Sequence, residues 1–578
     1  MKNKYKTNDI YKYILIFIII TFLFIRFQVA VLHFTHYDDL YPIYILKEIN
    51  SYTYEKMNNQ LLKYGVNEIT IKFFYEIFGN YYGLKLMKLI VAPIVISKTS
   101  TFAPLQFYIS NVLTNIETEY ITKIFLSRLT SLLSSIIYLY GTIKLFDELG
   151  IIRRNIDVIG FLTFPLTSWM FLIYSSQSEN YVIGLIYIPY LLMAINNCNK
   201  ITYQFRDVIK INILIVASIL STYQLIWFLP GLLIAYSINI YKNINISRKN
   251  KYIYIFHNIL FASFLVILVF KIFIQKLLIE RSAGSMKIGI GWNAGIDNQY
   301  QFSDGWINGL KEIINFPKFI FNNYCDVLWS MIGFGDYNDY IKYIYIFIFT
   351  ALCGYGIYIT FKEKKFRFIS YFSIINLFVW LSFILLGMLA FSPTRHSLIY
   401  MSLLWIYSGL AVIEIFKNGR VQIKYFTLSC LIILIVLFIK EYSNELDKRK
   451  NLYIKNSIIQ KIINDKPGYI FTYNFTLDLN MDKNIDKDYE REWINKKPFF
   501  EIYKRKINNN KNIMILCNSH KDCYEPKNID ELYANNNIDI KNYIVNDYSS
   551  VRSKTSVCYG DFTVNGTNEI LFKYLIFK

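Results

Sequence analysis

Long apolar runs separated by short basic loops constrain this chain more than any other feature of its sequence. The first run extends from Tyr13 to Leu32, and a helix needs ~20 mostly apolar residues to cross a bilayer. The 578 residues are 54% hydrophobic, and their mean hydropathy is +0.29. That composition excludes a soluble enzyme of ordinary make-up. We therefore predict an all-α polytopic membrane bundle.

The basic residues predict an orientation. The net charge of +20 is compatible with nucleic-acid binding, but the sequence contains no nucleic-acid motif and no basic groove with interleaved aromatics. Its lysines and arginines cluster in the loops between apolar runs, as the positive-inside rule requires of cytoplasmic loops. Lys2, Lys4, Lys6 and Lys12 precede the first run, so we expect a cytoplasmic N-terminus. Membrane lipids, and not nucleic acid, are the expected surroundings.

Placing every basic loop inside gives about eleven membrane spans. The run 211–240 is too long for one helix, and the polar stretch Ser221–Gln224 interrupts it midway, so we divide it into two spans there. The other expected spans are 13–32, 121–146, 156–174, 181–195, 253–274, 341–361, 369–391, 398–416 and 425–439.

Three segments are expected outside the cytoplasm. Residues 35–118 form a first outer loop with interfacial helices, and residues 275–339 form a second outer loop. Residues 441–578 follow the membrane domain 1–440 as a small extracytoplasmic α/β or α+β domain, because strand-like runs recur at 469–473 and 512–517. A bacterial inner or plasma membrane is the expected location.

The polar residues that interrupt the apolar runs converge on the outer side of this topology. A chance distribution would place such residues on both sides. Acidic groups there, together with Arg395 and His396, form a site able to hold an anionic lipid phosphate and activate a nucleophile. The converging residues are His36, Asp38, Asp39, Gln106, Gln177, Glu179, Tyr223, Gln224, Arg395 and His396.

Several short stretches, in the same order along the chain, resemble motifs of the GT-C superfamily of membrane glycosyltransferases. The resemblance is to the group that contains protein O-mannosyltransferases and lipid A aminoarabinose transferases. Asp38 and Asp39 stand where that group has an Asp-Glu pair after its first span, and Ala103 replaces one proline of its His-Pro-Pro-Leu stretch. The resemblance covers roughly residues 11–240. The matching stretches are Asp38–Asp39, Thr101–Leu105, Ser127–Ser131, Tyr174–Tyr181 and Thr222–Tyr223 with Pro230.

The resemblance implies an inverting transfer of a sugar from a polyprenyl-phosphate donor to a lipid, glycan or protein acceptor on the outer side. Asp38 would be the base that takes the acceptor proton, and Arg395 would hold the donor phosphate. Asp39 or Glu179 would orient the acceptor or bind a divalent cation. No cofactor is otherwise expected, and the identity of any metal is open.

Two other functions fit the same pattern. A lipid or solute transporter would use the polar residues as a substrate vestibule, although transporters place their contacts at mid-membrane and use broken helices and inverted repeats. A non-catalytic cell-envelope assembly protein would bind a partner through residues 441–578. Asp38 would be expendable in that third case.

Overall fold

The protein is mostly helical in the part that the computed structural model describes. The described residues are 2–32, 53–63, 68–79, 82–84, 105, 109, 113, 120–152, 154–178, 180–269, 306–329, 339–385, 391, 397–465, 469–472, 490–493, 513–516, 543–554, 557–559, 562–564 and 567–577. The chain divides into two compact units, of which the second comprises residues 31–44, 113–127 and 444–578. Each unit is described by itself below.

This is a multi-pass membrane protein. Within the described ranges, six helical segments are long and apolar enough to cross a bilayer, or seven if a bent pair is counted as one span. The six segments are Phe125–Glu148, Tyr223–Lys242, Arg248–Leu268, Tyr340–Lys362, Leu398–Asn418 and Val421–Ser443.

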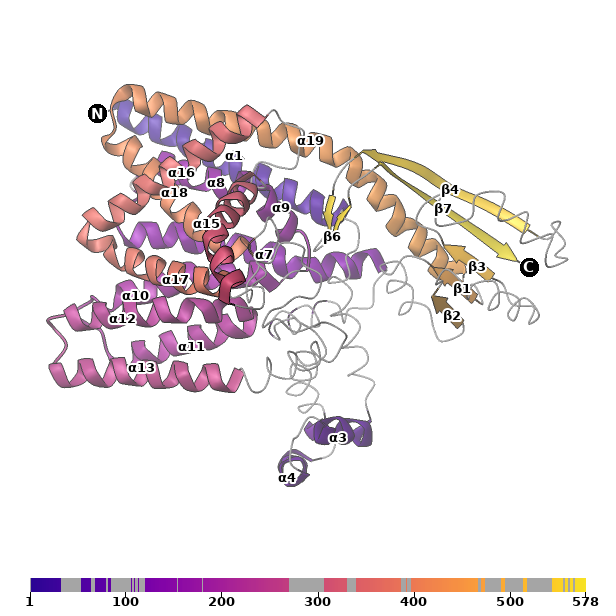
Figure 1. Cartoon of the computed structure of the whole chain (residues 1–578), viewed down its shortest axis with the longest axis horizontal. Helices are drawn as coiled ribbons and strands as arrows, with labels where there is room; N and C mark the ends of the chain where they lie inside the picture. The colour runs from indigo at the N-terminus through magenta and orange to yellow at the C-terminus, as the bar shows by residue number, and fades with distance from the viewer. Residues whose placement is uncertain are drawn as a thin grey trace. The chain divides into compact units, whose positions relative to one another are not determined.

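A helix or helix pair occupies every run that the sequence marked as a span (Figure 1). The helices are α1 (Lys2–Leu32), α7 (Tyr120–Glu148), α8 (Asn155–Thr167), α9 (Trp169–Ser175), α10 (Asn180–Asn197), α11 (Phe205–Ser221), α12 (Leu229–Lys242), α13 (Arg248–Val269), α16 (Asp339–Lys362), α17 (Arg367–Leu385), α18 (Leu398–Asn418) and α19 (Val421–Asp465). The 3-10 turns are η1 (Tyr223–Phe228) and η3 (Lys364–Phe366). The expected first outer loop, residues 35–118, contains α3 (Tyr54–Lys63) and α4 (Glu68–Phe78).

Helix α18 lies at the centre of the first unit. It packs against α8, α10 and α16, and 83% of its span is buried by protein, against 17% for α13. Figure 1 shows α10, α11, α12 and α13 side by side, and α13 contacts both α11 and α12. An apolar helix so poorly covered by protein has its remaining surface suited to lipid.

The expected span over residues 156–174 is a bent pair of helices, which the sequence did not predict. Helix α8 ends at Thr167, α9 begins at Trp169, and the two axes differ by 71°. Pro165 lacks the amide hydrogen that a helix interior uses. Ser168 is extended, and its hydroxyl accepts from the Phe171 N–H at 3.3 Å as the cap of α9. A proline followed by a capping serine therefore breaks the span.

The structure contains one helix that the sequence did not predict and one that is longer than predicted. Helix α15 (Trp306–Trp329) lies within the expected outer loop 275–339, where Lys311, Glu312, Lys318 and Asp326 prevent a continuous apolar run. Helix α19 continues to Asp465, well past the expected end of the last span at residue 439.

The helix ends that carry basic loops contact one another. Asn243 at the end of α12 donates to the carbonyls of Cys198 (2.7 Å) and Lys200 (3.1 Å), beyond the end of α10. Lys365 in η3 donates to the carbonyl of Leu149 at the end of α7 (3.1 Å). These contacts place the basic loops of neighbouring helices at a common end of the first unit.

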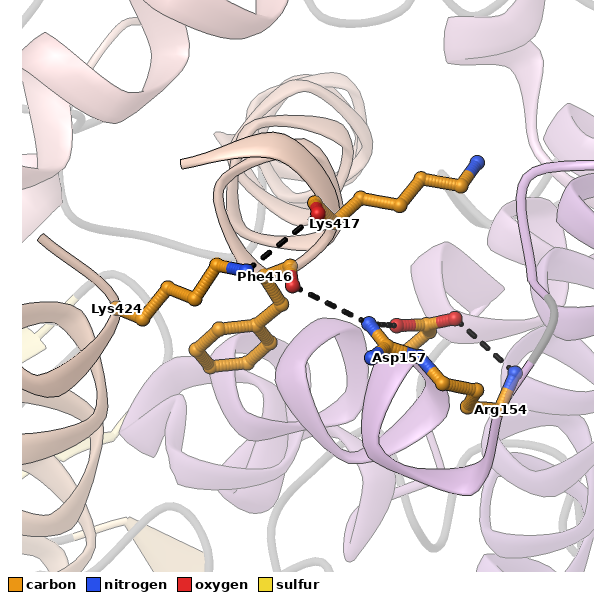
Figure 2. Close-up of polar contacts among 5 residues, drawn as sticks. All are labelled: Arg154, Asp157, Phe416, Lys417 and Lys424. Carbon is orange, nitrogen blue, oxygen red and sulfur yellow. Dashed lines mark hydrogen bonds and ion pairs between the residues drawn. The ribbon is translucent and has the colours of Figure 1, made fainter. Parts of the chain in front are cut away.

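Asp157 and Arg154 tie α8 to α18 at this basic end (Figure 2). The Asp157 carboxylate accepts from the Arg154 backbone N–H and from its Nη2, both at 3.0 Å, and is 0% exposed. The same Nη2 donates to the carbonyl of Phe416 at 3.3 Å. Lys424 adds a hydrogen bond to the carbonyl of Lys417 at 3.4 Å, which joins the start of α19 to the end of α18.

We expect Asp157→Asn to lower the melting temperature of the purified protein more than Asp207→Asn. Both aspartates occupy the third position of a helix and accept from the backbone N–H three residues earlier. The Asp207 side chain is 24% exposed, so water replaces its lost bonds. The Asp157 side chain has no access to water. Losing its charge-assisted hydrogen bonds therefore lowers the free energy of unfolding by roughly 1–3 kcal/mol. Equal melting temperatures for the two variants, measured in detergent, would contradict this difference.

The second unit contains a mixed sheet in the order β2-β1-β3-β7-β4. Strand β1 pairs in parallel with β2 and β3, whereas β7 pairs antiparallel with β3 and β4. Two further strands, β5 and β6, pair antiparallel. The strands are β1 (Tyr469–Thr472), β2 (Glu490–Trp493), β3 (Ile513–Leu516), β4 (Tyr543–Lys554), β5 (Val557–Tyr559), β6 (Phe562–Val564) and β7 (Thr567–Phe577).

Candidate functional site

Most of the predicted site residues lie outside the described part of the chain. Of the ten converging residues, the structure describes Gln177, Tyr223 and Gln224. The others are His36, Asp38, Asp39, Gln106, Glu179, Arg395 and His396. The candidate site is therefore built below from the described residues that flank them along the chain.

Tyr223 and Gln224 begin the 3-10 turn that interrupts the run 211–240, as the sequence predicted. Helix α11 ends at Ser221, whose hydroxyl donates to the Tyr187 hydroxyl of α10 at 3.1 Å. Thr222, 1% exposed, packs so closely on Gly184 that a methyl group on that glycine would lie 2.2 Å from its Cγ2. These contacts bring Tyr223, half-buried, to the start of α10.

The turn between α9 and α10 is buried rather than solvated. Its residues Ser176, Gln177 and Ser178, and Ser175 at the end of α9, are each at most 1% exposed. The Ser176 hydroxyl donates to the carbonyl of Leu172 at 2.8 Å and approaches that of Arg26 at 3.4 Å. The sequence predicted a short outer turn here, and such turns are ordinarily open to water. A buried polar turn instead contributes side chains to the interior of the bundle.

Arg26 is a buried cation that the sequence analysis overlooked. It is 1% exposed, and its guanidinium carbon lies 4.9 Å from the centroid of the Phe171 ring. Its Nη2 donates to the carbonyl of Pro165 at 3.5 Å, the outer limit of a hydrogen bond. Arginine at the centre of a spanning helix costs about 2.5–3.5 kcal/mol on insertion scales. The sequence feature that could have singled it out is a charged residue inside the apolar run 13–32.

Arg128 is equally buried but serves to join two helices. It is 1% exposed, and its Nη1 donates to the carbonyl of Ala30 at 2.7 Å. That bond satisfies one of the last carbonyls of α1, which have no partner within the helix. Arg128 therefore connects α7 to the end of α1.

Aromatic rings pack where α17, η1 and α18 meet. Trp380 stacks on Tyr400 with their ring centroids 3.5 Å apart, and Phe391 meets Trp380 edge-on at 5.0 Å. Phe228 of η1 stacks on the other side of the group, 5.7 Å from Tyr400. The rings connect η1, which begins at Tyr223, with the start of α18, which follows Arg395 closely in sequence.

The described residues contain no cluster of three or more His, Cys, Asp or Glu side chains able to hold a metal ion. The carboxylates that the sequence nominated for a divalent cation, Asp39 and Glu179, lie outside this set.

Comparison with known proteins identifies no family. No protein-family model matches the chain, and no curated protein matches it.

Proposed function

We propose that the chain is an integral membrane glycosyltransferase. It transfers a sugar, with inversion, from a polyprenyl-phosphate donor to a lipid, glycan or protein acceptor on the extracytoplasmic side. The observation that carries this proposal is the burial of Gln177, Ser178, Thr222 and Ser397, each at most 1% exposed. Polar side chains inside a membrane bundle are costly unless they are paired, and they commonly mark substrate pathways or sites.

In the proposed reaction the acceptor oxygen attacks the anomeric carbon of the donor sugar. The bond from that carbon to the phosphate oxygen breaks, and the phosphate leaves with the electron pair. Asp38 takes the acceptor proton, while Arg395 and His396 stabilise the charge that develops on the phosphate. Asp39 or Glu179 orients the acceptor or binds a divalent cation. His36, Gln106 and Tyr223 are the remaining candidates for substrate contact.

The proposal includes a finer architecture. The chain crosses the membrane about eleven times, with its basic loops in the cytoplasm. The N-terminus is then cytoplasmic, and the active site and residues 441–578 are outside the cytoplasm. The GT-C resemblance supports this arrangement, as do the contacts among the basic loops. The sheet of the second unit would then belong to a small extracytoplasmic α/β or α+β domain.

We expect Arg395→Ala to raise the KM for the donor about ten- to hundredfold, because a charge-assisted phosphate contact is lost. The KM for the acceptor should change much less. Initial rates at varied donor and acceptor concentrations separate the two effects. Arg248→Ala, at the exposed first residue of α13, serves as the matched control. A larger change in acceptor KM than in donor KM would contradict the phosphate role of Arg395.

One observation favours a transporter as the second candidate. The α8–α9 pair is a broken helix with a 71° bend, and broken helices form substrate sites in many transporters. A transporter moves its substrate intact, whereas a transferase cleaves the bond to the phosphate. Purified protein supplied with labelled donor therefore distinguishes the two by whether the sugar and lipid labels separate.

A further inference from the structure

We propose that the loops 198–204 and 243–247, together with Lys249, form a binding surface for the headgroups of anionic phospholipids. The two loops join α10 to α11 and α12 to α13, and all of these residues lie in the first unit. They are called the paired-loop surface below. The inference depends on the chain being a membrane protein and not on the proposed glycosyl transfer.

One buried asparagine holds the two loops together. Asn243 is 5% exposed, and its Nδ2 donates to the carbonyls of Cys198 and Lys200 in the other loop, at 2.7 and 3.1 Å. Its Oδ1 accepts from the Asn245 N–H at 2.9 Å within its own loop. Because this amide uses both its donor and its acceptor on backbone groups, the two loops are held in one arrangement. The paired-loop surface is therefore formed before any lipid binds.

Each loop exposes an isoleucine. Ile201 is 78% exposed and Ile244 is 91% exposed. They directly follow Lys200 and Asn243, of which the first accepts a hydrogen bond from the second. The two isoleucines therefore stand on adjoining segments of the surface. Since isoleucine is stabilised by removal from water, this pair suits the boundary between lipid headgroups and acyl chains.

The paired-loop surface lies at the depth of the membrane interface. Tyr241 and Tyr252 are exposed, and they lie at the loop ends of the candidate spans Tyr223–Lys242 and Arg248–Leu268. Tyrosine is enriched where a span meets the headgroups. Ile244 follows Tyr241 by three residues, so the loop that carries it lies at headgroup level.

The charge of this region favours anionic lipids. Residues 198–210 and 241–252 contain seven lysines and arginines and one carboxylate, Asp207, which pairs with Lys210 at 3.1 Å. Lys200 and Lys249 are exposed, and neither forms an ion pair with any residue that the structure describes. Exposed cations beside a membrane attract acidic phospholipids more strongly than zwitterionic ones.

The isoleucines decide between a lipid and a soluble anion. An acidic protein or a free phosphate compound would neutralise the lysines and leave Ile201 and Ile244 in water. A phospholipid offers both an anionic headgroup and acyl chains, and the surface already lies where such lipids are concentrated. The combination of charge, apolar side chains and interface depth therefore selects an anionic phospholipid.

The experiment measures lipid binding to the full-length, delipidated protein by native mass spectrometry. The probes are phosphatidylglycerol and phosphatidylcholine with identical acyl chains. We expect the wild type to bind phosphatidylglycerol roughly tenfold more tightly, and Lys200→Gln/Lys249→Gln to lose most of that preference. Lys144→Gln/Lys364→Gln is the matched control and should retain it. These lysines are exposed near the end of α7 and in η3, and their loss changes the net charge equally.

Ile201→Ser/Ile244→Ser separates the apolar contact from the charge. This variant should bind both lipids about tenfold more weakly. It should keep the preference for phosphatidylglycerol, because an isoleucine does not distinguish headgroups. The substituted side chains are all exposed, so every variant should melt at the wild-type temperature in detergent. Wild-type affinity of this variant for both lipids would contradict the proposed contact with acyl chains.

Three further results would overturn the paired-loop surface. The first is an unchanged preference for phosphatidylglycerol in Lys200→Gln/Lys249→Gln. The second is an equal loss in Lys144→Gln/Lys364→Gln, which would make net charge the cause. The third is displacement of phosphatidylglycerol by an equal concentration of soluble glycerol phosphate or polyglutamate, which would assign the lysines to a soluble anion or to an acidic protein.

Discussion

Asp38→Asn should lower sugar transfer by a factor of about 10²–10⁴, the contribution of a positioned general base. The amide keeps the size of the carboxylate and cannot accept the proton of the acceptor hydroxyl. Transfer of label from a radiolabelled polyprenyl-phosphate sugar to a membrane extract measures the effect. Donor binding should be nearly unchanged, because the loss arises at the transition state.

Asp147→Asn is the matched control for that variant, since Asp147 is exposed near the end of α7 and has no proposed role. Both proteins should be expressed and purified to the same extent. Equal transfer by Asp38→Asn and the wild type would refute Asp38 as the base. It would also favour the reading in which the chain is a non-catalytic assembly protein.

Gly356→Ala should destabilise the protein by roughly 1–3 kcal/mol. Gly356 lies where α16 crosses α18, and an added Cβ would be 2.0 Å from the carbonyl oxygen of Tyr407. The obstacle is backbone, so the two helices must separate to accommodate a methyl group. Melting temperature in detergent measures the loss.

Gly354→Ala, two residues earlier on the same helix, provides the control. An added Cβ there meets nothing within 4 Å, and alanine favours a helix over glycine by roughly 0.5–1 kcal/mol. We expect its melting temperature to stay the same or rise slightly. A fall comparable to that of Gly356→Ala would show that close approach to α18 is not the cause.

The positions of the membrane helices followed from hydropathy because a helix is the simplest way to satisfy a backbone in lipid. The interruption after Ser221 was also predictable, since polar residues divide an apolar run of excessive length. The break at Ser168 was not predicted, because Pro165 and Ser168 sit within a run that is otherwise apolar. Hydropathy averages over a window and does not register a bend.

The candidate site was less predictable than the helices. The sequence singled out polar residues at the ends of apolar runs, which is why Gln177 and Tyr223 were among its candidates. Arg26 was missed because it lies inside a run that is apolar enough to span without it. Its contact with the Phe171 ring, 145 residues away along the chain, depends on how α1 packs against α9.

Glycosyl transfer is tested most directly with a donor that carries one label on its sugar and a second on its polyprenyl chain. The purified wild-type protein is reconstituted in liposomes and supplied with this donor and with acceptor membranes. We predict that the sugar label moves to the acceptor fraction while the polyprenyl label remains in the lipid as the phosphate. Recovery of both labels on one intact molecule, for every sugar donor tried, would contradict the assignment.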